Sequence, residues 1–138
     1  IMVVPQGRPL AAPPSRVIVA WDATPAAVRA THDALPFIRR AAETLVVTVA
    51  DDKDLRPGQS GIELTHLLAR HGAKARFTAL RRDRGGVLEA IVAAARDAQA
   101  DLLVMGAMRH SPLRNMIMGS ATQDLLESGP PLATLVAS

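Results

Sequence analysis

One stretch of the chain carries the residue types of a phosphate-binding loop. Residues 106–120 read GAMRHSPLRNMIMGS and follow the apolar segment LLVM at residues 102–105. Gly106 stands where a strand is expected to end, and Gly119 and Ser120 stand where a helix is expected to begin. In α/β proteins, such places present backbone N–H groups to a phosphate. This stretch is therefore the best candidate site in the sequence.

The rest of the chain offers little catalytic chemistry. There is no cysteine, and the four histidines show no zinc-ligand spacing. Lys53 and Lys74, the only lysines, do not complete a G-x-x-x-x-G-K-[ST] motif. No set of nucleophile, base and acid can be assigned. We therefore expect a binding protein in preference to an enzyme, with no metal site and at most slow hydrolysis of a bound nucleotide.

Composition narrows the class of protein. With 138 residues, 49% of them hydrophobic, the chain is long enough for one domain with a substantial core. We find no signal peptide and no apolar run of membrane-spanning length, so we expect a cytoplasmic protein that does not bind membranes. The formal charge is only +3, the arginines are scattered, and the aromatic residues are few. Nucleic acid is therefore not an expected partner.

Short apolar runs alternate with longer segments of helical period, which is typical of a parallel sheet with crossover helices. The sequence predicts a five-stranded, parallel, doubly wound sheet of the Rossmann-like or flavodoxin-like kind. Strands are expected at residues 16–20, 44–49, 75–80, 101–105 and 132–137, and helices at residues 25–41, 61–70, 86–97 and 120–128. Pro36 is expected to bend the first helix or end its regular part. Gly72 is expected to cap the second helix in a left-handed conformation.

The first residues look like part of an earlier unit. Residues 1–5 (IMVVP) form a short apolar segment similar to PLATLVA at residues 131–137, and residues 7–15 read as a proline-rich linker. We interpret residues 1–15 as the last strand of a preceding domain with its linker, and residues 16–138 as the domain itself. A terminal strand at a sheet edge offers unpaired backbone groups. We therefore expect residues 1–5 to pair antiparallel with such an edge, in the same chain or a neighbouring one.

Three segments carry a resemblance to a known family. VIVAWDATPAAVRA at residues 17–30, ADLLVMGA at residues 100–107 and GSATQDLL at residues 119–126 resemble a universal stress protein domain, in the right order over residues 16–138. The beginning of the chain also resembles the junction in tandem universal stress proteins. The resemblance implies a three-layer fold of the adenine nucleotide alpha hydrolase-like type and a role in stress response. It further implies ATP with Mg²⁺ as ligand, and a homodimer or a pairing with another such domain through the last strand.

The family's glycine motif is incomplete in this chain. Nucleotide-binding members carry glycine, two residues, glycine, nine residues, then glycine with serine or threonine. Gly106, Gly119 and Ser120 match this pattern, but Arg109 stands in place of the second glycine. Its guanidinium is suited to bind the phosphates, or else it fills the pocket. Alternatively, Gly106 is only a turn at the strand end, Arg109 a solvated loop residue and Ser120 a helix N-cap.

Four further positions follow from the resemblance. It places Asp22 near the adenosine moiety, the backbone of Val49 at the adenine edge, and Ala20 and Ala121 among the lining residues. The alternative role for Asp22 is to complement the dipole of the first helix. Two functions stay open: an ATP-binding domain, or an interaction domain of the same fold in which Arg109 prevents nucleotide binding. A small-molecule enzyme is a third reading, because a fold by itself does not identify chemistry.

Overall fold

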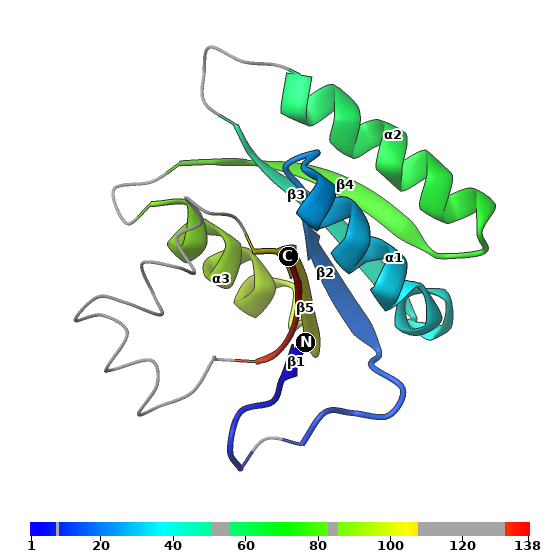
Figure 1. The fold of residues 1–138 in the computed structure, drawn as a ribbon, viewed down its shortest axis with the longest axis vertical. Coiled ribbons are helices and arrows are strands. Elements are labelled where there is room, and N and C mark those ends of the chain that lie inside the picture. The colour runs from blue at the N-terminus through cyan, green and yellow to red at the C-terminus, as the bar shows by residue number, and fades with distance from the viewer. Residues whose placement is uncertain (8, 51–55, 83–85, 108–131) are drawn as a thin grey trace.

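The computed structural model describes residues 1–7, 9–50, 56–82, 86–107 and 132–138, and within them the chain forms strands and helices in alternation (Figure 1). The helix expected at residues 120–128 lies outside the described residues. The elements, in chain order, are β1 (Met2–Val3), β2 (Arg16–Ala20), α1 (Pro25–Arg40), β3 (Glu43–Ala50), α2 (Arg56–Arg70), β4 (Ala75–Arg81), α3 (Val87–Asp97), β5 (Leu102–Gly106) and β6 (Ala133–Ala137).

The strands form one sheet in the order β1-β6-β5-β2-β3-β4. The five predicted strands are present and parallel to their neighbours. β1 adds a sixth strand to these five, antiparallel to β6, as expected for residues 1–5. Numbered along the chain without β1, the strands have the order 3-2-1-4-5 across the sheet, which is the Rossmann order.

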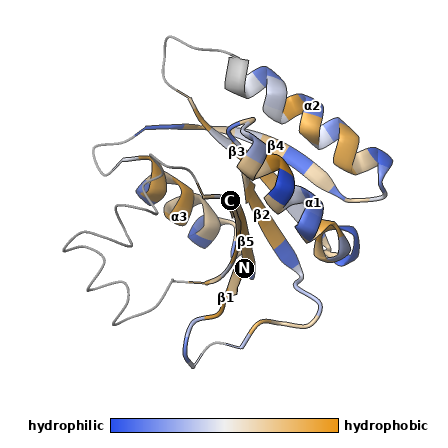
Figure 2. Ribbon diagram, in the orientation of Figure 1, coloured by the Kyte–Doolittle hydropathy of each residue, from blue (hydrophilic) through white to orange (hydrophobic). Residues whose placement is uncertain are grey.

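Helices cover both faces of this sheet (Figure 1). Because successive side chains of a strand point to opposite faces, β2 contributes to two cores. Val17 and Val19 pack in the core beneath α1 and α2, whereas Ile18 packs in the core beneath α3. In Figure 2 the central strands are orange along most of their length, and the helices mix orange with blue. The doubly wound architecture predicted from the sequence is thus confirmed.

The ends of α1 follow from local chemistry. Thr24 is the N-cap and accepts a hydrogen bond from the Ala27 amide, and Pro25 occupies the first turn, where its missing N–H is not needed. α1 ends at Arg40, close to the predicted end at residue 41, so of the two effects expected of Pro36 an early end of the helix is wrong. Proline removes one hydrogen bond there, but the fully buried Ile38 holds the last turn against the sheet.

α2 begins at Arg56, earlier than the predicted start at Gly61. Gly61 serves close packing instead: a Cβ at this position would lie 2.4 Å from Phe77 Cε2 and 2.9 Å from Thr48 Cγ2. A side chain here would displace the Phe77 ring and the Thr48 methyl group, so glycine lets the helix lie close to β3 and β4. Its end agrees with the prediction, since Gly72 follows Arg70 and His71 with a φ of +86°.

Two polar contacts lie at the end of the sheet where the parallel strands begin. The Asp101 carboxylate accepts hydrogen bonds from the amides of Ser15 (2.8 Å) and Arg16 (2.9 Å) through Oδ2. Glu43 of β3 accepts a hydrogen bond from Arg76 of the neighbouring β4, and this contact lowers the pKa of the Glu43 carboxyl below its ordinary value. Both contacts join segments that are distant in sequence.

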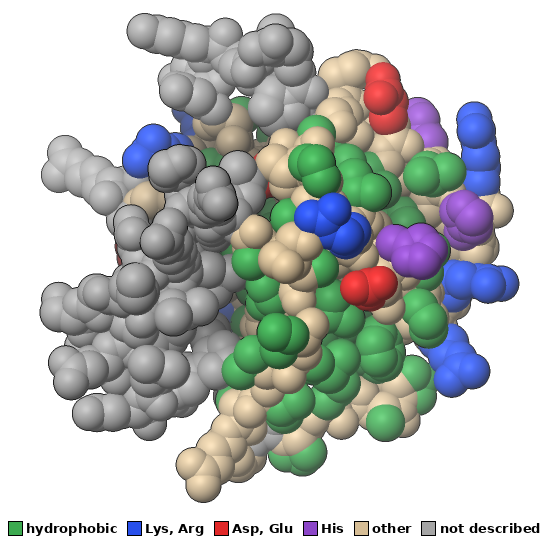
Figure 3. All heavy atoms as spheres, viewed as in Figure 1, with side chains coloured by type: hydrophobic (Ala, Val, Ile, Leu, Met, Phe, Trp, Pro, Cys, Tyr) green, Lys and Arg blue, Asp and Glu red, His purple; other side chains and the backbone are tan. Residues whose placement is uncertain are grey.

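Basic side chains gather near this same end of the sheet. α1 ends with Arg39 and Arg40, and α2 ends with Arg70. In Figure 3, His side chains and several Lys and Arg side chains gather on the side toward which α1 and α2 run in Figure 1. Positive charge at a helix C-terminus complements the helix dipole. Because each helix runs back from the end of the preceding strand, this charge lies away from the carboxyl ends of the strands. Among the described helices, none has the length and apolar character needed to cross a membrane.

Candidate functional site

The carboxyl ends of β2 and β5 lie side by side at the topological switch point of the sheet. β2 pairs with β3 on one side and with β5 on the other, and Ala20 at its end is opposite Met105. The chain leaves β2 toward α1 on one face, whereas α3, on the other face, leads into β5. In open α/β sheets, ligands bind in the crevice outside the carboxyl ends of the strands at such a point.

Gly106, the last residue of β5, lets the N-terminus of α1 approach the strand. A Cβ at this position would lie 2.5 Å from the Ala27 nitrogen, 2.8 Å from the Ala26 carbonyl carbon and 2.9 Å from the Ala26 Cβ. Backbone atoms cannot move aside as a flexible side chain can, so only glycine fits without a shift of the helix. In the described residues Gly106 therefore has a packing role. The sequence had suggested a phosphate-binding residue or a turn at the strand end, and neither interpretation included this role.

Asp22 lies in the turn between β2 and α1, where its carboxylate is held in place. Asp22 Oδ1 accepts hydrogen bonds from the Thr24 amide (3.0 Å) and the Thr24 hydroxyl (2.6 Å). Thr24 Oγ1 in turn accepts a hydrogen bond from the Ala27 amide (3.2 Å). The residue between them, Ala23, adopts a φ of +59°, which is uncommon for a residue with a side chain. Hydrogen bonds through Ala27 and Thr24 thus link the contact between α1 and Gly106 to the exposed carboxylate of Asp22.

Trp21 is a residue of this region that the sequence reasoning did not select. Its amide donates a hydrogen bond to the Val47 carbonyl (2.8 Å), and its indole Nε1 donates to Ser60 Oγ of α2 (2.9 Å). The side chain also packs against the core beneath α1 and α2. It is the only tryptophan of the chain and directly follows a predicted strand, and these two facts could have identified it as a residue of the site region from the sequence.

The structure brings together part of the predicted site. Ala20 and Gly106 end adjacent strands, and Asp22 follows Ala20 by two residues. Val49 lies near the carboxyl end of β3, half-buried on the α3 side of the sheet. The other predicted residues lie outside the described residues: Arg109, Gly119, Ser120 and Ala121. Within the described ranges, no group of three His, Asp or Glu side chains is placed to hold a metal ion.

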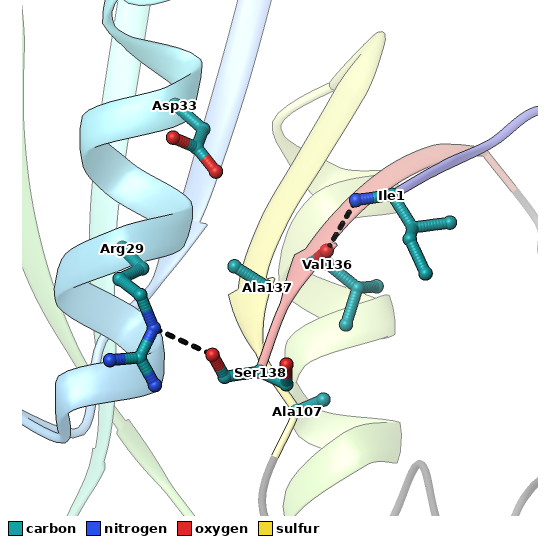
Figure 4. Close-up of a pocket in the computed structure, with 7 residues that line it drawn as sticks. All are labelled: Ile1, Arg29, Asp33, Ala107, Val136, Ala137 and Ser138. Carbon is teal, nitrogen blue, oxygen red and sulfur yellow. Dashed lines mark hydrogen bonds between the residues drawn. The ribbon is translucent and has the colours of Figure 1, made fainter.

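A shallow cavity of about 330 Å³ lies elsewhere, between α1 and the end of β6 (Figure 4). Arg29 crosses it and donates a hydrogen bond from Nε to the Ser138 carbonyl oxygen (2.6 Å). Its lining residues are Ile1, Arg29, Asp33, Ala107, Val136, Ala137 and Ser138. Of the predicted site residues that the structure describes, Ala20, Asp22, Val49 and Gly106, none belongs to this lining, although Ala107 follows Gly106 directly.

Comparison with known proteins shows which solved structures share this architecture. A search of the curated proteins found no match. Among solved structures, the universal stress protein UspA from Lactobacillus plantarum is 21% identical, with a TM-score of 0.59, and 90% of this chain and 97% of that chain are covered. A universal stress protein from Archaeoglobus fulgidus DSM 4304 is 20% identical, with a TM-score of 0.64, and here 90% of this chain covers only 45% of that chain.

A third solved structure, a universal stress protein in complex with cAMP, is 17% identical, with a TM-score of 0.64, and 91% of this chain and 97% of that chain are covered. At these identities the likeness concerns the fold. The family itself follows from the sequence comparison, in which the model of the Universal stress protein family matches residues 14–131. With most of its length matched and the same fold, the chain belongs to the universal stress protein family.

Proposed function

We propose that this domain binds an adenine nucleotide, ATP with Mg²⁺, over the carboxyl ends of β2 and β5, as part of a stress response. The observation that carries the proposal is the exposed Asp22 carboxylate, which the turn before α1 holds at the switch point. A preoriented carboxylate accepts hydrogen bonds from the hydroxyl groups of a ribose, as acidic residues do in dinucleotide-binding folds. One structural relative is a cAMP complex, which supports an adenine nucleotide as the ligand class.

The part of this proposal that concerns the phosphates rests on the sequence. Gly106 is in the described part of the site, and the chain continues from it through Arg109 toward Gly119 and Ser120. We propose that the Arg109 guanidinium binds the phosphates, supplying charge where the family's glycine would supply backbone contacts. Mg²⁺ prefers to keep several water ligands and to bind through phosphates, so it would arrive with the nucleotide.

Calorimetric titration tests the proposal with ATP and Mg²⁺ in one series and cAMP in a second. The test variant is Asp22→Asn, which removes the charge and keeps the size. The matched control is Asp97→Asn, which makes the same change on an exposed residue at the end of α3, far from the switch point. We expect affinity to fall about tenfold in Asp22→Asn, as for a hydrogen bond to a charged group, and to stay unchanged in Asp97→Asn. A folded protein that gives no heat at millimolar nucleotide would contradict the proposal.

A second candidate is an interaction domain that pairs with another universal stress protein domain through its last strand. The edge of β6 supports this reading because it already accepts an antiparallel strand, β1. In this case Arg109 blocks the nucleotide site. The two candidates predict opposite results for Arg109→Gly: affinity for ATP falls if the guanidinium binds the phosphates, and rises if it fills the pocket.

A further inference from the structure

Four basic side chains lie on the surface where α1 and α2 end. Arg39 and Arg40 are the last residues of α1, and Arg70 is the last residue of α2. Lys74 lies in the connection between α2 and β4. All four residues are exposed. Together they form what we call the basic surface.

The start of β3 brings the members of the basic surface together. The Lys74 carbonyl accepts a hydrogen bond from the Thr44 amide of β3 (2.8 Å). Arg40 precedes Glu43, the first residue of β3, by three residues, which span at most about 11 Å. α1 and α2 cover the same face of the sheet, so their ends lie over the starts of neighbouring strands. Figure 3 shows several Lys and Arg side chains, with His side chains among them, on this side of the molecule.

The basic surface differs from the other cations at this end of the sheet in its charge balance. Within the described ranges, none of its four side chains forms a salt bridge with a carboxylate. Each of the other cations here has an acidic residue beside it: Glu43 for Arg76, Asp101 for Arg16 and Asp97 for Arg96.

Helix dipoles do not account for this cluster of charge. The four positive charges exceed the formal charge of +3 of all 138 residues, so the rest of the sequence is close to neutral. A cation complements the helix dipole only within the last turn, and Lys74 lies beyond the end of α2. α3 has the same dipole, yet its cation Arg96 is directly followed by Asp97. The basic surface is therefore suited to bind an anionic group from outside the chain.

The residue types favour carboxylates of a protein as that group. Three of the four cations are arginines, whose planar guanidinium pairs with a carboxylate through two hydrogen bonds. Leu67, one turn before Arg70 on the same side of α2, is 48% exposed and offers an apolar contact beside the charges. Stacking on bases is not available, because Trp21, Phe37 and Phe77, the only aromatic residues, pack against the core beneath α1 and α2.

We propose that the basic surface binds an acidic segment of a partner protein, with several Asp or Glu side chains for the cations and an apolar side chain for Leu67. The basic surface lies at the opposite end of the strands from Asp22 and Gly106. The proposal is therefore independent of the nucleotide site and of pairing through the last strand. Because exposed ion pairs are weak and screened by salt, binding should be modest and salt-sensitive.

Fluorescence anisotropy tests the proposal with a labelled peptide that carries glutamates on both sides of a leucine. A second peptide has glutamines in place of the glutamates. One test variant combines Arg39→Gln with Arg40→Gln, and the other combines Arg70→Gln with Lys74→Gln. The matched control is Arg96→Gln, which removes an exposed cation from the last turn of α3 on the other face of the sheet. Circular dichroism verifies that each variant is folded.

We expect the glutamate peptide to bind and the glutamine peptide not to bind. Each double variant should weaken the affinity about fivefold, as the loss of two exposed ion pairs implies, and the combination of both should weaken it further. Arg96→Gln should leave the affinity unchanged. Raising the salt concentration from about 0.05 M to about 0.5 M should remove most of the binding, because the Debye length falls severalfold.

Three outcomes would overturn the proposal. The first is a folded wild-type protein that does not bind the glutamate peptide at low salt, even at about 1 mM protein. The second is an equal loss of affinity in Arg96→Gln and the double variants, which would mean that overall charge, and not the basic surface, attracts the peptide. The third is tighter binding of a short DNA duplex or of phosphatidylserine vesicles through the same four residues, which would make the partner a nucleic acid or a membrane.

Discussion

Replacement of Gly106 by alanine should destabilise the domain through a backbone clash. The added Cβ would lie 2.5 Å from the Ala27 nitrogen and 2.8 Å from the Ala26 carbonyl carbon, well inside contact distance. Since both obstacles are backbone atoms in the first turn of α1, the whole N-terminus of the helix has to shift. That shift pulls the Ala27 amide away from Thr24 Oγ1, the acceptor that caps the helix.

The size of the effect follows from three contributions. Overpacking a well-packed site costs about 1–3 kcal/mol. Weakening the N-cap adds about 0.5–1 kcal/mol, toward the lower end of the range for cap removal. Alanine gives the unfolded chain less conformational entropy than glycine does, and this offsets about 0.4–1 kcal/mol of the destabilisation. We therefore expect Gly106→Ala to lower the free energy of unfolding by about 2 kcal/mol.

Urea unfolding measures this change, with the fluorescence of Trp21 and circular dichroism as independent probes. The matched control is Gly58→Ala in α2, where an added Cβ meets nothing within 4 Å. Alanine is the better helix former, so this control should be neutral or more stable by up to about 1 kcal/mol. An equal or higher unfolding free energy for Gly106→Ala would refute the packing role assigned to Gly106.

Three further substitutions test other contacts. Asp101→Asn weakens the charge-assisted hydrogen bonds at the start of β2 and should lower the unfolding free energy by about 1–2 kcal/mol in urea titration, whereas an unchanged value would mean that the carboxylate does not hold this strand. Ser60→Ala leaves the Trp21 indole N–H without its partner and should cost about 1 kcal/mol, with a changed emission maximum in the folded state. Glu43→Gln removes the ion pair with Arg76, which is exposed and therefore contributes under about 1 kcal/mol. Because the folded pKa of Glu43 is lowered, this contribution is present above the unfolded pKa of about 4.3 and is lost as pH falls through the folded pKa. The stability difference between wild type and Glu43→Gln should therefore shrink between pH 7 and pH 3, and a constant difference would show that charge is not its source.

The sequence by itself determined the elements whose signals are local. The β-branched runs around Ile18 and Val46 specified buried parallel strands, because such runs suit a sheet covered on both faces. Thr24 marked the beginning of α1, since a cap bonds to amides within one turn. Gly72 marked the end of α2, since a residue with positive φ favours glycine. The same reasoning predicted an antiparallel partner for the last strand, and β1 confirmed it.

The tertiary structure alone decided the roles that depend on residues far apart in the chain. Gly106 and Gly61 stood in the sequence as a phosphate-loop residue and a helix start, but each is a point where a helix meets a strand too closely for a side chain. Trp21, which follows β2, acquired its partner Ser60 only when α2 packed against the neighbouring strands β3 and β4. Close packing and long-range hydrogen bonds arise from the folded arrangement of distant segments, so the short-range patterns of a sequence do not encode them.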